Sequence, residues 1–157
     1  MPAICTLWDA SEQKTPLRPG TSAANQVFAE FGQDIARLTK LGKEVIVILP
    51  GPCNAMWAPE SLSRMASAVE ITNQVRMARS DFETFIQPVK KPLMDAVISN
   101  GGKTIDPLDY FEEAGFLNGK TSGGRFRYRD GEHMRPFYVI EKATFLDPLL
   151  GAKPGVQ

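Results

Sequence analysis

Residues 42–52 read GKEVIVILPGP, and they are the strongest indicator of the fold class. After its first residue, the run from Glu44 to Leu49 is apolar, rich in β-branched side chains and free of polar alternation. Such a run is typical of a strand that is covered on both faces of a parallel sheet. The prolines that follow end the strand and begin a loop at its carboxyl end, where open α/β sheets usually bind their ligands.

The segments before this strand predict a strand–helix–strand unit. Ala3–Trp8 is a short apolar run that we expect to form a buried strand, and residues 9–20 form a loop rich in turn formers. Thr21 or Ser22 can cap a helix that continues to about Leu41 and ends at Gly42. One stripe of this helix carries Phe28, Phe31, Ile35 and Leu38.

The segments after the strand are mainly helical. Prolines at 88 and 92 interrupt the helical pattern, so we expect separate helices over about 80–87 and about 91–99. Residues 103–105 form a third strand, and residues 137–150 a closing helix. We therefore predict a three-layer, flavodoxin-like α/β domain over residues 1–150, with a parallel sheet, helices on both faces and a flexible tail over residues 151–157.

The composition is that of an ordinary globular domain. Hydrophobic residues make up 43% of the 157 residues, and the 18 basic side chains balance 18 acidic ones. A balanced charge gives no global field toward nucleic acid, so we expect no nucleic-acid partner. The two cysteines, Cys5 and Cys53, are too few for a disulfide framework or a zinc cluster, and we expect neither a metal nor an organic cofactor. No apolar run approaches the ~20 residues of a membrane span.

Residues 128–133, which read YRDGEH, carry the most specific chemical signal. His133 is the only histidine in the chain, and Asp130 precedes it by three residues. On a turn, a carboxylate at this spacing can reach the nearer imidazole nitrogen and fix the tautomer of the ring. The other nitrogen can then accept the proton of a serine hydroxyl. Taken alone the spacing is a weak signal, and Glu132 is either a rival partner or a solvated loop charge.

The segment from Gly124 to Leu150 resembles the last conserved block of SGNH hydrolases, above all of SGNH domains fused to membrane acyltransferase-3 domains. In that block a tyrosine precedes Asp-x-x-His, an apolar residue follows the histidine, and a helix ends in an apolar–Asp stretch. The matching positions are Tyr128, Asp130, His133, Met134 and Asp147. Earlier parts of the family pattern also have counterparts, in the same order along the chain. They are Leu7–Trp8, residues 42–52 and residues 104–107.

Several features of the family pattern have no counterpart. Neither the Gly-Asp-Ser block, whose serine is the nucleophile, nor a Gly-x-Ser-x-Gly sequence occurs. The oxyanion-hole asparagine has no clear counterpart near Trp8, and residues 111–117 lack the cysteines seen in several fused members. The resemblance therefore implies that the chain begins at the third strand of the family fold, and that the first two strands and the serine lie upstream.

The serines that the chain does contain lack the strand-to-helix elbow that exposes a nucleophile. They include Ser22, Ser61, Ser63, Ser67 and Ser122. Ser22 lies at a helix cap, and we expect none of the others to be the nucleophile.

Three further side chains are candidate substrate contacts: Trp8, Trp57 and Arg135. Trp57 could stack on a sugar ring or serve as a partly buried anchor of its loop. Arg135 belongs to a group of arginines around the Asp-x-x-His segment, which form either a solvated face or a contact to an anionic glycan. The other members of the group are Arg125, Arg127 and Arg129.

The resemblance implies a serine-dependent O-acyltransferase or esterase that acts on cell-envelope glycans at the periplasmic or extracellular side of the membrane. His133 would be the base and then the acid, and Asp130 would orient it. The implied partners are a glycan or acyl-ester substrate, an upstream segment with the serine, and a membrane acyltransferase domain. Alone, the chain would be nearly inactive. Two alternatives are a non-catalytic module that binds carbohydrate or protein, and a small esterase that uses its own serine.

Overall fold

The structure is a computed structural model that describes residues 7–8, 16–63 and 75–150. The chain divides into two compact units. Unit 1 comprises Met1–Ile4, Gly51–Phe82 and Pro107–Gln157, and unit 2 comprises Cys5–Pro50 and Glu83–Asp106.

The first helix of unit 2, α1 (Ser22–Lys40), confirms the predicted helix at both ends. The hydroxyl of Thr21 accepts the backbone N–H of Ala24 at 3.3 Å, which satisfies one of the free donors at the helix start. Gly42 has a φ of +74°, the left-handed conformation that glycine adopts at little cost after a helix. Of the predicted apolar stripe, Phe28 and Ile35 are buried and Phe31 is half-buried, but Leu38 is 39% exposed.

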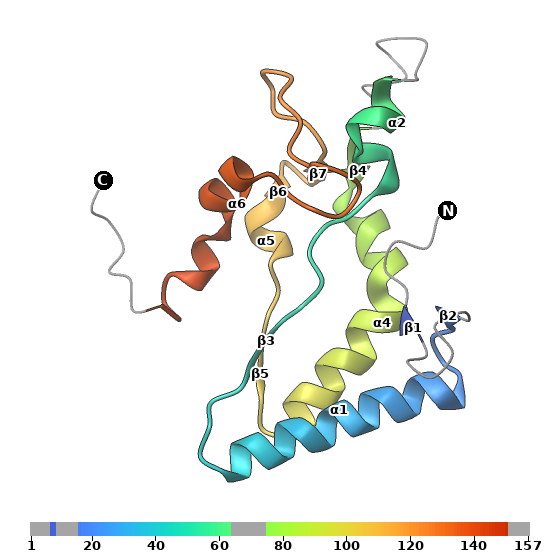
Figure 1. Cartoon of the computed structure of the whole chain (residues 1–157), viewed down its shortest axis with the longest axis vertical. Helices are drawn as coiled ribbons and strands as arrows, with labels where there is room; N and C mark the ends of the chain where they lie inside the picture. Colours follow the sequence, from blue (N-terminus) through green and yellow to red (C-terminus); the bar gives the residue numbers. More distant parts are fainter. Residues whose placement is uncertain (1–6, 9–15, 64–74, 151–157) are drawn as a thin grey trace. The chain divides into compact units, whose positions relative to one another are not determined.

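Two parallel strands, β3 (Ile46–Ile48) and β5 (Lys103–Ile105), confirm the α/β class (Figure 1). Ile46 pairs with Lys103, and Ile48 pairs with Ile105. The described part of this sheet holds two strands. The side chains of β3 are less completely buried than we expected for a strand covered on both faces. Ile48 keeps 46% of its surface exposed.

The described part of the expected first strand, β1 (Leu7–Trp8), does not join the parallel pair. It pairs antiparallel with β2 (Pro16–Leu17), which we had assigned to a loop. A partner this close in sequence requires only a short loop to be closed, which costs little chain entropy. Residues 3–6 of the expected strand lie outside the described residues.

A single helix, α4 (Arg79–Ser99), replaces the two helices that we expected on either side of the prolines. Pro88 and Pro92 lie inside it, although an interior proline costs roughly 3 kcal/mol. The buried face of the helix carries Phe82, Ile86 and Val97. Burial of each large apolar side chain contributes about 1.5–3 kcal/mol. The three buried side chains together are therefore enough to offset the cost of the two prolines.

Unit 1 contains a small antiparallel sheet that the sequence patterns did not indicate. Its strands, in the order β4-β7-β6, are β4 (Arg76–Ala78), β7 (Phe116–Asn118) and β6 (Glu112–Glu113). Strands of two or three residues are too short for an alternating pattern to be recognised.

The other elements that the structure describes in unit 1 are short helices. They are η1 (Ala55–Trp57), α2 (Pro59–Ser63), α5 (Leu108–Phe111), α6 (Pro136–Lys142) and η2 (Ala143–Leu146). The predicted closing helix is thus divided into α6 and the 3₁₀ turn η2. Its inward face packs aromatic rings, since Tyr138 and Phe145 are both buried against Phe111.

Candidate active site

The Asp-x-x-His segment forms the tip of a narrow hairpin in unit 1. The backbone N–H of Arg129 donates to the carbonyl of His133 at 2.8 Å, and that of Arg135 donates to the carbonyl of Arg127 at 2.8 Å. Tyr128 and Met134 form the antiparallel bridge between these two bonds. The hairpin therefore presents residues 130–132 as a tight loop.

The carboxylate of Asp130 holds this loop by local hydrogen bonds. Its Oδ1 accepts the backbone N–H of His133 at 2.8 Å and that of Glu132 at 2.9 Å. These two bonds, the first the stronger, together with the hydrogen bond and charge of the His133 ring, lower the pKa of Asp130 from 3.8 to about 2. The group is therefore an anion at any physiological pH.

The imidazole of His133 faces the same carboxylate. Its Nδ1 lies 2.9 Å from Oδ2 and 3.1 Å from Oδ1 of Asp130. A carboxylate only accepts, so this contact favours the tautomer with the proton on Nδ1 and leaves Nε2 as an acceptor. The His133 side chain is 75% exposed, so a reactant can approach the ring. Glu132, the rival partner, contributes its backbone N–H to the Asp130 carboxylate.

The loop borders an open depression of about 340 Å³. Its lining residues are Ala55, Ala58, Asp130, Gly131, Glu132 and His133. One wall of the depression is the segment with Ala55 and Ala58, and the other is the loop at 130–133. A hydrogen bond joins the two walls, since the backbone N–H of Asn54 donates to the Gly131 carbonyl at 2.9 Å. A Cβ on Gly131 would lie 2.8 Å from the Ala55 Cα, so the contact requires glycine. We assigned no role to Asn54 or Gly131 from sequence, and the glycine inside the loop was the only available signal.

Tyr128 and Trp57 form the buried support beneath the hairpin. Their ring centroids lie 4.8 Å apart, and the Tyr128 hydroxyl donates to the Pro52 carbonyl at 3.0 Å. Burial raises the pKa of Tyr128 well above its usual value. Trp57 is 0% exposed, so the structure places it as a loop anchor and gives a sugar no free face on which to stack. The side chain of the other tryptophan candidate, Trp8, lies outside the described residues.

The arginines around the hairpin do not form the single solvated face considered from sequence. Arg127 is only 4% exposed, and its Nη2 donates to Glu113 at 2.6 and 2.7 Å. Burying a guanidinium is tolerable only with such a partner. Arg125, Arg129 and Arg135 are exposed. The structure therefore separates one structural arginine from three that can reach solvent.

No serine hydroxyl among the described side chains is hydrogen-bonded to His133. The Ser61 hydroxyl donates to the Ala55 carbonyl at 3.2 Å, Ser22 begins α1, and Ser122 is exposed in the glycine-rich loop. The Ser63 side chain and Ser67 fall outside the described set.

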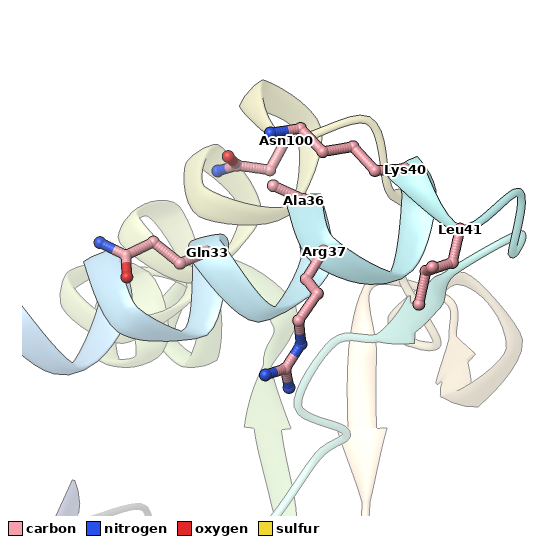
Figure 2. Close-up of a pocket in the computed structure, with 6 residues that line it drawn as sticks. All are labelled: Gln33, Ala36, Arg37, Lys40, Leu41 and Asn100. Carbon is pink, nitrogen blue, oxygen red and sulfur yellow. The ribbon is translucent and has the colours of Figure 1, made fainter.

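A second depression, of about 390 Å³, lies in unit 2 and offers no comparable chemistry. Figure 2 shows that its lining side chains come from the second half of α1, from Leu41 directly after that helix, and from Asn100 after α4. Arg37 there pairs with Asp34 at 3.0 Å. Among the described residues, no group of His, Cys, Asp and Glu side chains could hold a metal ion.

A carboxylate that holds the Nδ1 side of an exposed imidazole is an arrangement that recurs in hydrolases of unrelated folds. The family model for the SGNH domain (fused to AT3 domains) matches residues 6–140, and the chain belongs to this family. Membership implies a hydrolase- or acyltransferase-type domain, and the fusion suggests a membrane acyltransferase domain as partner. Neither the curated proteins nor the solved structures include a significant match. No helix in the described ranges has the length and apolarity that crossing a bilayer requires.

Proposed function

We propose that this chain supplies the base and its orienting carboxylate to a serine-dependent O-acyltransferase or esterase domain acting on cell-envelope glycans. The observation that carries the proposal is the contact of both Asp130 carboxylate oxygens with Nδ1 of an exposed His133 ring. This contact leaves Nε2 free to exchange a proton.

In the proposed reaction, a serine Oγ attacks the carbonyl carbon of an acyl ester while its proton moves to Nε2 of His133. The tetrahedral intermediate collapses, the ester C–O bond breaks, and Nε2 returns the proton to the leaving oxygen. The acyl group then passes from the serine to a sugar hydroxyl or to water by the reverse sequence. Asp130 stays ionised throughout and stabilises the imidazolium. No metal or organic cofactor takes part.

The proposal places the nucleophile in a segment upstream of residue 1, because the sequence contains neither a Gly-Asp-Ser block nor a Gly-x-Ser-x-Gly elbow. That segment and backbone amides would also provide the oxyanion hole. The family's fusion to AT3 domains supports a site outside the cytoplasmic membrane and a membrane domain that delivers the acyl group. By itself the chain should turn over almost no ester.

The first test uses the full-length protein and an O-acetylated glycan, with release or transfer of acetate as the measurement. Wild type should react, and His133→Ala should lower kcat by at least about 10³-fold, since such a base is essential. Glu141→Gln is the control, because that side chain is 57% exposed and does not line the depression beside His133. Activity in His133→Ala equal to wild type would refute the proposal.

A fluorophosphonate probe followed by peptide mass spectrometry locates the nucleophile. Labelling of a serine upstream of residue 1, lost in His133→Ala, is the expected result. Labelling of a serine inside residues 1–157 would show instead that the chain is a small esterase with its own nucleophile. A protein that carries no label and turns over no acyl ester, yet binds glycan, would be the non-catalytic module.

A further inference from the structure

Another depression of unit 1 lies next to the site hairpin and has a volume of about 370 Å³. Its lining residues are Arg125, Phe126, Arg135, Pro136 and Phe137. Two guanidinium groups thus face a floor of two aromatic rings and a proline.

The two arginines lack the partners that other arginines of unit 1 possess. Arg79 is bonded to Asp109 and Glu112, and Arg127 to Glu113. Among the described residues, no carboxylate pairs with Arg125 or Arg135. The charges of Arg125 and Arg135 are therefore not neutralised by a carboxylate of the described residues, unlike those of Arg79 and Arg127.

Both guanidinium groups are held in place despite lacking an acid. The Nε of Arg135 donates to the Tyr128 carbonyl at 3.1 Å, which leaves the two terminal nitrogens for another acceptor. The Arg125 Cζ lies 3.8 Å from the Phe137 ring centroid, a stacked cation–π geometry. A guanidinium fixed in this way loses less entropy when it binds an anion.

We propose that this depression is a subsite for an anionic sugar residue of the glycan, with its carboxylate or phosphate between Arg125 and Arg135. The planar fork of arginine matches both anions by paired hydrogen bonds. One face of each ring is covered by a cation, Phe126 by Lys120 at 4.2 Å and Phe137 by Arg125 at 3.8 Å. Pro136 and the remaining surface of the two rings provide the apolar lining for the C–H groups of the sugar. This subsite rests on the proposed function, because it assigns the glycan that the Asp130–His133 site would modify.

The position of Arg135 on the hairpin links the subsite to the reactive site. Arg135 follows His133 by two residues, which corresponds to about 7 Å of extended backbone. Residues two apart on such a strand project to the same side. A sugar bound by Arg135 would therefore lie close to the sugar whose hydroxyl or ester faces His133.

The test measures binding of oligosaccharides to the full-length protein by isothermal titration calorimetry. The probes are an oligogalacturonate, the same oligosaccharide with its carboxylates methyl-esterified, and glucose 6-phosphate beside glucose. The first pair isolates the contribution of a carboxylate, and the second that of a phosphate. We expect at least one anionic probe to bind about tenfold more tightly than its neutral counterpart, with the difference falling at high salt.

Arg125→Gln and Arg135→Gln should each remove most of that difference, and Arg129→Gln is the matched control. Arg129 is exposed on the same hairpin but does not line the depression. Arg125→Gln is decisive if Arg135→Gln unfolds, because the Arg125 side chain only stacks on Phe137. Equal binding of anionic and neutral probes would overturn the subsite, as would an equal loss in Arg129→Gln. Neither result would affect the loss of acetyl turnover expected in His133→Ala.

Discussion

Both carboxylate oxygens of Asp130 lie within 3.1 Å of Nδ1 of His133, and Oδ1 also accepts the backbone N–H of that histidine at 2.8 Å. The same carboxylate thus fixes the loop backbone and the ring that the loop carries. Because these bonds span three residues, the orientation of the imidazole depends mainly on the loop itself.

Replacing Asp130 with Asn should preserve the loop but not the tautomer of the ring. The amide oxygen can still accept the backbone N–H groups, but its NH₂ group is a donor and favours the wrong ring nitrogen as base. We expect kcat for acetyl transfer or hydrolysis to fall by about 10³- to 10⁴-fold. Glu141→Gln, which lies outside the depression, should remain near wild type. A wild-type kcat in Asp130→Asn would contradict the assigned orienting role.

Asp130 should also make stability depend on pH. Its pKa is lowered from 3.8 to about 2 in the folded chain, first by the His133 backbone N–H. A lowered pKa stabilises the fold above the unfolded value, and this contribution is lost as the pH falls from about 4 to about 2. The Tm difference between wild type and Asp130→Asn should therefore shrink over that interval. A difference that stays constant from pH 6 to pH 2 would show that this carboxylate has no such effect.

Gly131→Ala should separate the loop from the wall of the depression. The added Cβ would lie 2.8 Å from the Ala55 Cα and 3.1 Å from the Asn54 carbonyl oxygen, both backbone atoms that cannot rotate away. Such overpacking costs about 1–3 kcal/mol of unfolding free energy, and the shifted loop should also lower activity. Urea unfolding measures the first effect.

The control for that variant is Gly123→Ala, where the nearest atom to a new Cβ is the Thr121 Oγ1 at 3.9 Å. Its unfolding free energy should stay within about 0.5 kcal/mol of wild type. Equal stability of the two alanine variants would contradict the close contact.

Glu113→Gln should destabilise unit 1 through Arg127. Burial alone would raise the pKa of Glu113, but hydrogen bonds and charges of Arg127 and Lys142 outweigh it, so the net shift is downward. Removal of the anion leaves a guanidinium that is 4% exposed without its charge partner. We expect a loss of about 2–4 kcal/mol in urea unfolding, less than for a fully buried pair because Glu113 is partly exposed.

Glu141→Gln is the matched control for Glu113→Gln. Glu141 contacts the same Lys142 at 3.6 Å, but its side chain is 57% exposed. An exposed pair of this kind contributes at most about 1 kcal/mol, so the variant should unfold almost as wild type does. A loss as large as that of Glu113→Gln would argue against a special role for the buried arginine.

Local signals in the sequence predicted the elements that short-range interactions define. The Thr21 cap and the Gly42 terminator predicted the bounds of α1. The apolar run at 44–49 predicted β3, and the stop signal at 100–102 preceded the predicted strand β5. Proline positions misled the prediction for α4, because local propensity carried no information about the apolar face that packing stabilises.

The site shows the same division. The approach of Asp130 to His133 follows from a spacing of three residues and from the tendency of aspartate to accept nearby backbone N–H groups, so sequence was sufficient to suggest it. Three other features depend on contacts between residues that are distant along the chain. They are the packing of Trp57 on Tyr128, the Glu113–Arg127 pair and the Asn54–Gly131 hydrogen bond. Only the tertiary structure decided these features, because burial and pairing depend on which distant segments fold against one another.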